Sequence, residues 1–326
     1  MRIFLAQQNY HIGNFEYNTA KIISAIEEAK AKGGDLILFS ELSVCGYAPR
    51  DFLEFNDFIE KCYAAIDVIK QYADGIAVIV GAPDRNKRKE GKDLHNAAFF
   101  LCDKEIKAVI HKTCLPNYDV FDEYRYFEPA YDWNIVAYKG KRLAITVCED
   151  IWNLGDNPLY RICPMDELMK FNPDVMLNIS ASPFDYTHVE YRKAIVKLNV
   201  QKYKLPMLYC NSVGSQTEIV FDGGSLVFDK DANMIAHLPL LQETLVRVDL
   251  KDDGTFEQSI QQKAVDVPNE ELNPLHLDET LSIREIHDAI VLGIKDYFSK
   301  MGFTKAILGS SGGIDSAVTL AIACTA

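Results

Sequence analysis

The chain has 326 residues, of which 48% are hydrophobic and 25% are charged. These values are typical of a globular protein long enough for one large domain and part of a second. The net charge of −13 argues against a broad nucleic-acid-binding surface, which would be basic. No apolar run approaches the length that a transmembrane helix needs, so the sequence predicts no membrane span.

The cysteines and the N-terminus indicate the cellular setting. The eight cysteines show no CxxC spacing and no accompanying histidine cluster, so we expect no zinc site. Several of them stand in apolar stretches, which fits reduced thiols in a cytoplasmic protein. The opening residues, MRIFLAQQNYHIGNF, contain only a short apolar stretch without a small-residue cleavage site, so we expect no signal peptide.

Apolar patterning predicts strands and helices in alternation along most of the chain. The expected strands are 2–9, 35–41, 76–83, 174–183, 207–213, 223–229, 234–239 and 244–250, with hairpins at 95–113 and 133–150. Helices are expected at 18–31, ended by Gly33 and Gly34, and at 52–72. A further helix follows the strand at 174–183, with Tyr191, Ala194, Ile195 and Leu198 as its apolar face.

This order predicts an α/β fold with mixed sheets covered by helices. If helices cover one face of each sheet and the two sheets stack, the result is a four-layer α-β-β-α sandwich. We expect this domain to span residues 1–250.

The sequence changes character after residue 250. Residues 251–280 are polar with little periodicity, which predicts a linker. An amphipathic helix (283–301), a short strand (304–309), a glycine-rich turn and the start of another helix follow. Because so small a segment cannot build its own core, we expect 281–326 to be the first part of a second, truncated domain.

Three reactive side chains share one setting, the end of an apolar strand: Glu41, Lys112 and Cys148. Strand ends are where α/β proteins build their sites, so the three side chains could converge. Glu41 would then act as general base, Lys112 would favour the thiolate and stabilise an oxyanion, and Cys148 would attack an amide carbon. The backbone N–H after Cys148 would be a second oxyanion donor.

Each residue alone also fits an ordinary structural role. Glu41 would serve as a cap or in a surface ion pair, Lys112 as a solvated cation, and Cys148 as a small core residue. Glu149 and Asp150 directly follow Cys148 and would oppose thiolate formation if they faced the sulfur.

The flanking stretches favour the catalytic interpretation. SELSVCGYAPRD (40–51), KTCLPNYDVFDEYRYF (112–127), CEDIW (148–152) and NISASP (178–183) resemble the nitrilase superfamily of carbon–nitrogen hydrolases over roughly residues 1–250. Within it they are most similar to the glutaminase domains of the glutamine-dependent NAD+ synthetase family. The resemblance implies a nitrilase-like fold and a Glu-Lys-Cys triad of Glu41, Lys112 and Cys148, with no cofactor in this domain.

The same resemblance implies further site residues. Tyr118 would contact glutamine, Glu123 would support the triad, and Ser182 would bind the amino-acid end of glutamine. His188 stands where the family often has a lysine, six positions after that serine. The pocket lining is also expected to include Glu149 and Trp152, for which structural support is the alternative role.

A second motif, SSGGIDS, stands between the expected strand 304–309 and the last helix. Glycines let backbone N–H groups approach an anion at a helix N-terminus, and serines add hydroxyl donors. The motif lacks the GK[ST] of a Walker A loop. It resembles the pyrophosphatase loop of N-type ATP pyrophosphatases, which have a Rossmann-like fold. The expected ATP-binding residues are Gly309, Ser311, Gly312, Gly313, Asp315 and Ser316.

Together the two resemblances imply glutamine hydrolysis that supplies ammonia for ATP-dependent amidation of deamido-NAD+. They also imply Mg2+ with the ATP in the full-length protein, and a homo-oligomer. Two alternatives stay open from the sequence. One is a stand-alone nitrilase-superfamily amidase acting on another small amide, and the other is a catalytically silent docking module.

Overall fold

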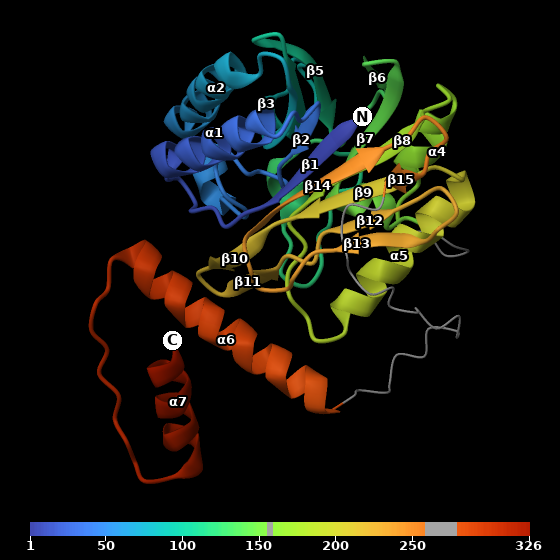
Figure 1. Cartoon of the computed structure of the whole chain (residues 1–326). Coiled ribbons are helices and arrows are strands. Elements are labelled where there is room, and N and C mark those ends of the chain that lie inside the picture. The colour runs from blue at the N-terminus through green and yellow to red at the C-terminus, as the bar shows by residue number, and fades with distance from the viewer. Residues whose placement is uncertain (155–158, 258–278) are drawn as a thin grey trace.

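The computed structural model describes residues 1–154, 159–257 and 279–326 (Figure 1). Within the first 257 residues two large sheets lie face to face, and helices cover the outer face of each. Among the described residues, no helix combines the length and the apolar character that crossing a membrane requires.

The first sheet has seven strands in the order β15-β14-β1-β2-β3-β4-β5. Its strands are β1 (Arg2–Gln7), β2 (Leu36–Leu38), β3 (Ala77–Arg85), β4 (Leu94–Cys102), β5 (Glu105–His111), β14 (Thr244–Leu250) and β15 (Phe256–Glu257). Strands β1, β2 and β3 run parallel, and the remaining pairs are antiparallel. Its outer face is covered by α1 (Phe15–Ala31) and α2 (Asn56–Ile69), and 3-10 turns at Arg50–Glu54 and Lys70–Tyr72 flank α2.

The second sheet has six strands in the order β13-β12-β9-β8-β7-β6. They are β6 (Val136–Tyr138), β7 (Lys141–Val147), β8 (Val175–Ser180), β9 (Met207–Asn211), β12 (Leu226–Phe228) and β13 (Met234–His237). It is covered by α4 (Pro164–Met169) and α5 (His188–Tyr203), while α3 (Glu123–Tyr126) is a single turn between β5 and β6. A hairpin of β10 (Val213–Gln216) and β11 (Ile219–Asp222) forms a separate small sheet that the sequence patterns did not predict.

Alternation along β1 shows how the layers are built. Phe4 points into the cluster shared with α1 and α2, whereas Ile3 and Leu5 point into the cluster between the two sheets. Neighbouring residues of a strand face opposite sides of the sheet, so a strand that is apolar throughout is buried on both faces. The predicted four-layer α-β-β-α sandwich is confirmed.

The predicted apolar face of the helix after β8 is wrong at Leu198, whereas Ile195 packs against a buried hydrophobic cluster. Leu198 is 43% exposed, and the buried face of α5 instead carries Arg192, Val196 and Asn199. Two of these residues are polar, and each has partners in the fold: Arg192 pairs with Asp222, and the Asn199 amide donates to the Ile151 carbonyl. Hydrophobic periodicity misses a helix face that is buried through polar contacts.

The C-terminal segment packs on one part of the sandwich. Helix α6 (Glu279–Met301) contacts β10 and β11, and α7 (Ile314–Thr325) lies beside it (Figure 1). The strand predicted at 304–309 is wrong, because no strand in the described part of the chain lies beside it to complete a ladder, and Ile307 is fully exposed. Of the expected linker, 256–257 form β15, and 258–278 lie outside the described residues.

Candidate functional site

A buried ion cluster lies where β2 and β5 end. Strand β2 stops at Leu38, three residues before the predicted end, and Glu41 follows in a tight turn. This turn packs so closely on β3 that a Cβ at Gly81 would lie 2.3 Å from the Leu42 nitrogen, which only glycine allows. The turn directs Glu41 inward, where its Oε1 lies 2.7 Å from Lys112 Nζ.

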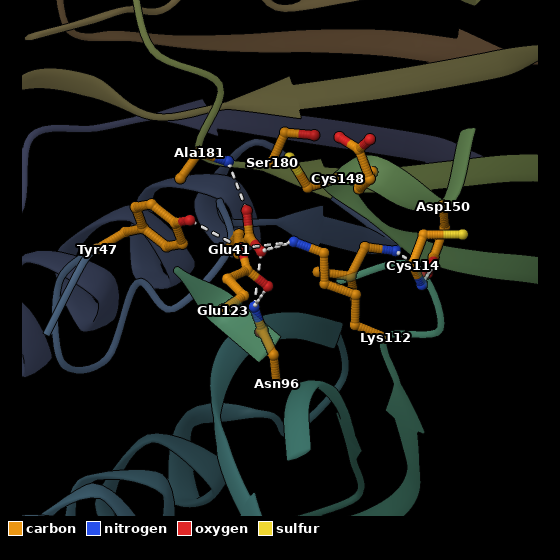
Figure 2. Close-up of polar contacts among 12 residues, drawn as sticks. Glu41, Tyr47, Asn96, Lys112, Cys114, Glu123, Cys148, Asp150, Ser180 and Ala181 are labelled. Atoms are coloured by element: carbon orange, nitrogen blue, oxygen red, sulfur yellow. Dashed lines mark hydrogen bonds and ion pairs between the residues drawn. The ribbon is translucent and has the colours of Figure 1, made fainter. Parts of the chain in front are cut away.

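Lys112 also contacts a second carboxylate. Its ammonium lies 2.7 Å from Glu123 Oε1, so one cation sits between two buried carboxylates (Figure 2). The Lys112 pKa is raised well above its usual value, because the attraction of Glu123 and Glu41 outweighs the loss of hydration. Burial raises the pKa of Glu123 to about 7, although Lys112 opposes that shift.

Two neighbours that sequence reasoning missed complete this cluster. The Asn96 amide donates to Glu41 Oε1 at 2.7 Å, and the Tyr47 hydroxyl donates to Glu123 Oε1 at 2.7 Å. The second oxygen of Glu41 accepts the backbone N–H of Ala181 at 2.9 Å. A polar Asn96 inside the apolar run of β4 was the available signal, because a buried amide needs polar partners.

Cys148 follows the last residue of β7 and begins a one-turn 3-10 helix, Cys148–Ile151. Its φ of +43° is uncommon outside glycine, so the turn is sharp. The thiol is buried, and burial raises its pKa well above the usual value; Glu41 raises it further and Lys112 lowers it. Glu41 and Lys112 thus act on the thiol pKa in opposite directions, and burial favours the protonated form.

Asp150 joins the chain segments that carry Lys112 and Cys148. One carboxylate oxygen accepts the backbone N–H groups of Thr113 and Cys114 at 2.9 and 2.8 Å, and the other accepts that of Val147 at 3.0 Å. The sequence itself indicated no such connecting role for Asp150. Burial raises its pKa to about 6, opposed by those donors.

Glu149 faces a different group of residues from Asp150. It accepts hydrogen bonds from the Tyr118 hydroxyl at 2.8 Å and the Tyr160 hydroxyl at 3.2 Å. Burial raises the pKa of Glu149, and the hydrogen bond from Tyr118 opposes the shift. The structure thus brings together two of the predicted pocket residues, and Trp152 is partly buried at the end of the same turn.

Ser182 lies two residues beyond β8, which runs parallel to β7. Its backbone N–H donates to Asn211 at 2.8 Å, and its hydroxyl lies 3.4 Å from Arg192 Nη2. Arg192 was not among the predicted site residues. His188 is the first residue of α5, and its side chain lies outside the described part of the structure.

The glycine-rich loop lies apart from these residues, on the α6–α7 segment. Gly312 has a φ of +82°, and Gly313 caps α7, a helix of 12 residues. The Ser316 hydroxyl donates to the Gly313 carbonyl at 2.9 Å, and the loop is exposed from Gly309 to Asp315. An exposed helix N-terminus with adjacent hydroxyl groups fits a phosphate group.

Comparison with known proteins places these features in a family context. The carbon–nitrogen hydrolase model matches residues 2–255, and the NAD synthase model matches residues 286–326. A glutamine-dependent NAD(+) synthetase from Synechocystis is 35% identical over 99% of this chain and 57% of that protein. The chain therefore spans little more than half the length of such relatives.

Solved structures give the same result. A glutamine-dependent NAD+ synthetase from Acinetobacter baumannii, in complex with ADP, superimposes with a TM-score of 0.82 at 32% identity, covering 99% of this chain and 57% of that one. An amidase from Nesterenkonia superimposes with a TM-score of 0.66 at 22% identity, covering 78% of this chain and 94% of that one. The second likeness concerns the fold alone.

Proposed function

Because the chain belongs to the carbon–nitrogen hydrolase family, we propose that residues 1–250 are a glutaminase domain. Its ammonia would serve the ATP-dependent amidation of deamido-NAD+ in a longer protein, of which 281–326 begin the synthetase domain. The linker between the two domains would follow β15. The observation that carries this proposal is the buried contact between Glu41 and Lys112 within electrostatic reach of Cys148.

Acylation is the first step. Glu41 takes the thiol proton while the Cys148 sulfur attacks the side-chain amide carbon of glutamine. Lys112 and the backbone N–H after Cys148 stabilise the negative charge that develops on the amide oxygen. When the tetrahedral intermediate collapses, the C–N bond breaks, Glu41 returns the proton to the leaving nitrogen, and ammonia departs from a glutamyl thioester.

Hydrolysis of the thioester completes the cycle. Glu41 takes a proton from water, the resulting hydroxide attacks the thioester carbon, and the C–S bond breaks. The proton passes to the Cys148 sulfur, and glutamate leaves. Acylation needs a base because burial raises the thiol pKa, and hydrolysis needs one because water is a weak nucleophile. The Asn96 and Ala181 donors hold Glu41 in place for both steps.

The substrate contacts follow from residue chemistry. Tyr118 and Glu149 form a hydroxyl–carboxylate pair suited to the polar end of an amino acid, and Ser182 offers a hydroxyl for its carboxylate. Trp152 would line the pocket and His188 would lie at its edge. Glu123 would support Lys112 rather than touch the substrate.

The loop 309–316 would bind the phosphates of ATP. Its residues fit that ligand, since the N-terminus of α7 is exposed and Ser311 and Ser316 hydroxyls lie 3.2 Å apart beside it. Asp315 supplies a carboxylate in the first turn of α7, which is suited to Mg2+ held jointly with phosphate oxygens. Bound Mg2+ would neutralise phosphate charge.

We also propose that the full-length protein is a homo-oligomer.

The test is ammonia release from glutamine, measured for this chain and for a full-length version supplied with ATP and deamido-NAD+. The expected result is glutamine-dependent ammonia in at least the full-length protein, and little release from asparagine. Hydrolysis of another small amide in preference to glutamine would favour a stand-alone amidase. If no amide is hydrolysed and a glutamine-analogue electrophile leaves Cys148 unmodified, the proposal is wrong.

A further inference from the structure

A second buried ion pair lies behind Ser182, outside the Glu41 and Lys112 cluster. Arg192 is 1% exposed, and its Nη2 lies 2.9 Å from Asp222 Oδ1, where Asp222 is fully buried. Its Nη1 donates to the Gly223 carbonyl at 3.1 Å. Burying two charged groups has a high desolvation cost. A buried ion pair beside the proposed substrate pocket therefore points to a role in substrate binding.

The ion pair and Ser182 share one hydrogen-bond network. Asn211 Oδ1 accepts the Ser182 N–H at 2.8 Å, and Asn211 Nδ2 donates to the Gly223 carbonyl at 2.8 Å. The same amide lies 3.3 Å from the Ser182 carbonyl and 3.4 Å from Asp222 Oδ1. The Asn211 side chain therefore holds the backbone N–H and carbonyl of Ser182. It also contacts Gly223 and Asp222, the two residues that hold Arg192.

This network borders the site proposed for catalysis. Ala181, the residue before Ser182, donates its N–H to Glu41. Strand β8, which leads to Ser182, pairs in parallel with β7, which leads to Cys148, so both residues lie at the same edge of the sheet. Asn178 of β8 lies 3.4 Å from the Cys148 carbonyl.

The direction of one hydrogen bond determines how Arg192 affects the Ser182 hydroxyl. A guanidinium group can only donate, so the Ser182 oxygen is the acceptor in the 3.4 Å contact with Nη2. With its oxygen accepting there, the hydroxyl hydrogen of Ser182 must point elsewhere. A hydroxyl that accepts from a cation is also a stronger donor, because linked hydrogen bonds polarise one another.

We infer that Arg192 is a positioning residue for substrate binding, which acts by making Ser182 a donor to the carboxylate of the amino-acid substrate. The inference rests on the proposed glutaminase function and adds a residue that sets substrate specificity. Arg192 itself is held by Asp222 and Gly223 and does not touch the substrate. Its effect therefore reaches the substrate through Ser182.

A double-mutant cycle tests this inference in the full-length protein, with glutamine as substrate. Ser182→Ala and Arg192→Lys should each raise KM about tenfold with kcat changed less than about twofold, as for loss of one binding contact. In the Ser182→Ala background, Arg192→Lys should raise KM no further, because the two residues act through one hydroxyl. Lys197→Gln on the same helix is the control and should leave both constants unchanged.

A second substrate separates positioning from general damage. 4-Aminobutanamide has the same amide but no carboxylate, so kcat/KM for this compound should be unchanged in Ser182→Ala and in Arg192→Lys. Where Arg192→Lys fails to fold, the pair Arg192→Met with Asp222→Asn removes the donor without leaving a buried charge unpaired. It should give the same KM increase for glutamine.

Additive KM effects of Ser182→Ala and Arg192→Lys, or an equal loss with 4-aminobutanamide, would overturn the inference. Either result would show that Arg192 acts on the fold rather than through Ser182. Failure of the unmodified protein to hydrolyse glutamine would instead overturn the proposed function, so the two failures are distinguishable.

Discussion

Lys112 Nζ lies 2.7 Å from Glu41 Oε1, and both side chains are fully buried. Because Glu123 contacts the same ammonium, the cluster holds one fixed cation and two acids. Burial raises the pKa of Glu123, the second acid, to about 7, which favours its protonated form. Glu41 also accepts hydrogen bonds from Asn96 and Ala181, which hold its carboxylate in place beside Lys112.

Removing the shared cation should destabilise the fold. Lys112→Met leaves two buried acids without a counter-charge, which costs about 3–5 kcal/mol of unfolding free energy. Adding Glu123→Gln should restore part of that loss, because one acid is then neutral. Urea denaturation at pH 7.5 measures the unfolding free energy of Lys112→Met and of the double variant with Glu123→Gln. Lys104→Met, which breaks an exposed ion pair with Asp74, is the control and should leave stability nearly unchanged. An equal loss in Lys112→Met and Lys104→Met would contradict the buried cluster.

The raised pKa of Glu123 predicts how its contribution to stability depends on pH. The folded state binds the Glu123 proton more tightly than the unfolded chain, so this group lowers stability progressively as pH rises from about 4.5 to about 7. Glu123→Gln cannot titrate, and its stability relative to the unmodified protein should therefore increase between pH 5 and pH 8. Urea denaturation at pH 5 and pH 8 measures this difference in unfolding free energy, with the exposed Asp122→Asn variant as control. A relative stability that falls over this range would contradict the assignment.

Asp150→Asn should disturb the connection between the Lys112 and Cys148 segments. The carboxylate accepts N–H groups at both oxygens, whereas an amide nitrogen at either position faces a donor. We expect a loss of about 1–3 kcal/mol in unfolding free energy and at least a tenfold lower kcat with glutamine. Thermal denaturation measures the loss of stability, and steady-state kinetics with glutamine measure kcat. Unchanged kcat in a folded variant would show that Asp150 does not position the reacting groups.

Glu41→Gln should reveal the protonated state of the thiol. With the base removed, alkylation of Cys148 by iodoacetamide at pH 7 should be about 100-fold slower or more. The remaining rate should rise about tenfold per pH unit between pH 7 and pH 9, because burial raises the thiol pKa and only the thiolate reacts. Peptide mapping separates Cys148 from Cys114. If Glu41→Gln reacts as fast as the unmodified protein at pH 7, the thiolate already exists and Glu41 is not its base.

The sequence predicted the layers of the fold because buried parallel strands are apolar throughout and their helices alternate with them. It also singled out Glu41, Lys112 and Cys148 by their places at strand ends. It missed the turn at Leu42, which shortens β2, and the β10–β11 hairpin, whose strands are only four residues long. It predicted a strand at 304–309 from apolar content alone, although a strand also needs a neighbour.

The polar supports of the site were less accessible to sequence reasoning. Asn96, Asp150 and Arg192 act through partners that lie 55, 37 and 30 residues away along the chain. No local pattern encodes such contacts, because they depend on which strand ends meet. The buried Arg192 and Asn199 also place polar side chains on the buried face of α5, which hydrophobic periodicity cannot predict.

The most direct test of the account is to incubate the full-length protein with glutamine, quench with acid within the first turnovers, and map the modified peptide by mass spectrometry. The account predicts one glutamyl group on Cys148, formed with a burst of ammonia, and no adduct in Cys148→Ala. The same variant should still make NAD+ from added ammonia. Glutamine hydrolysis that persists in Cys148→Ala, or a glutamyl adduct on another residue, would contradict it.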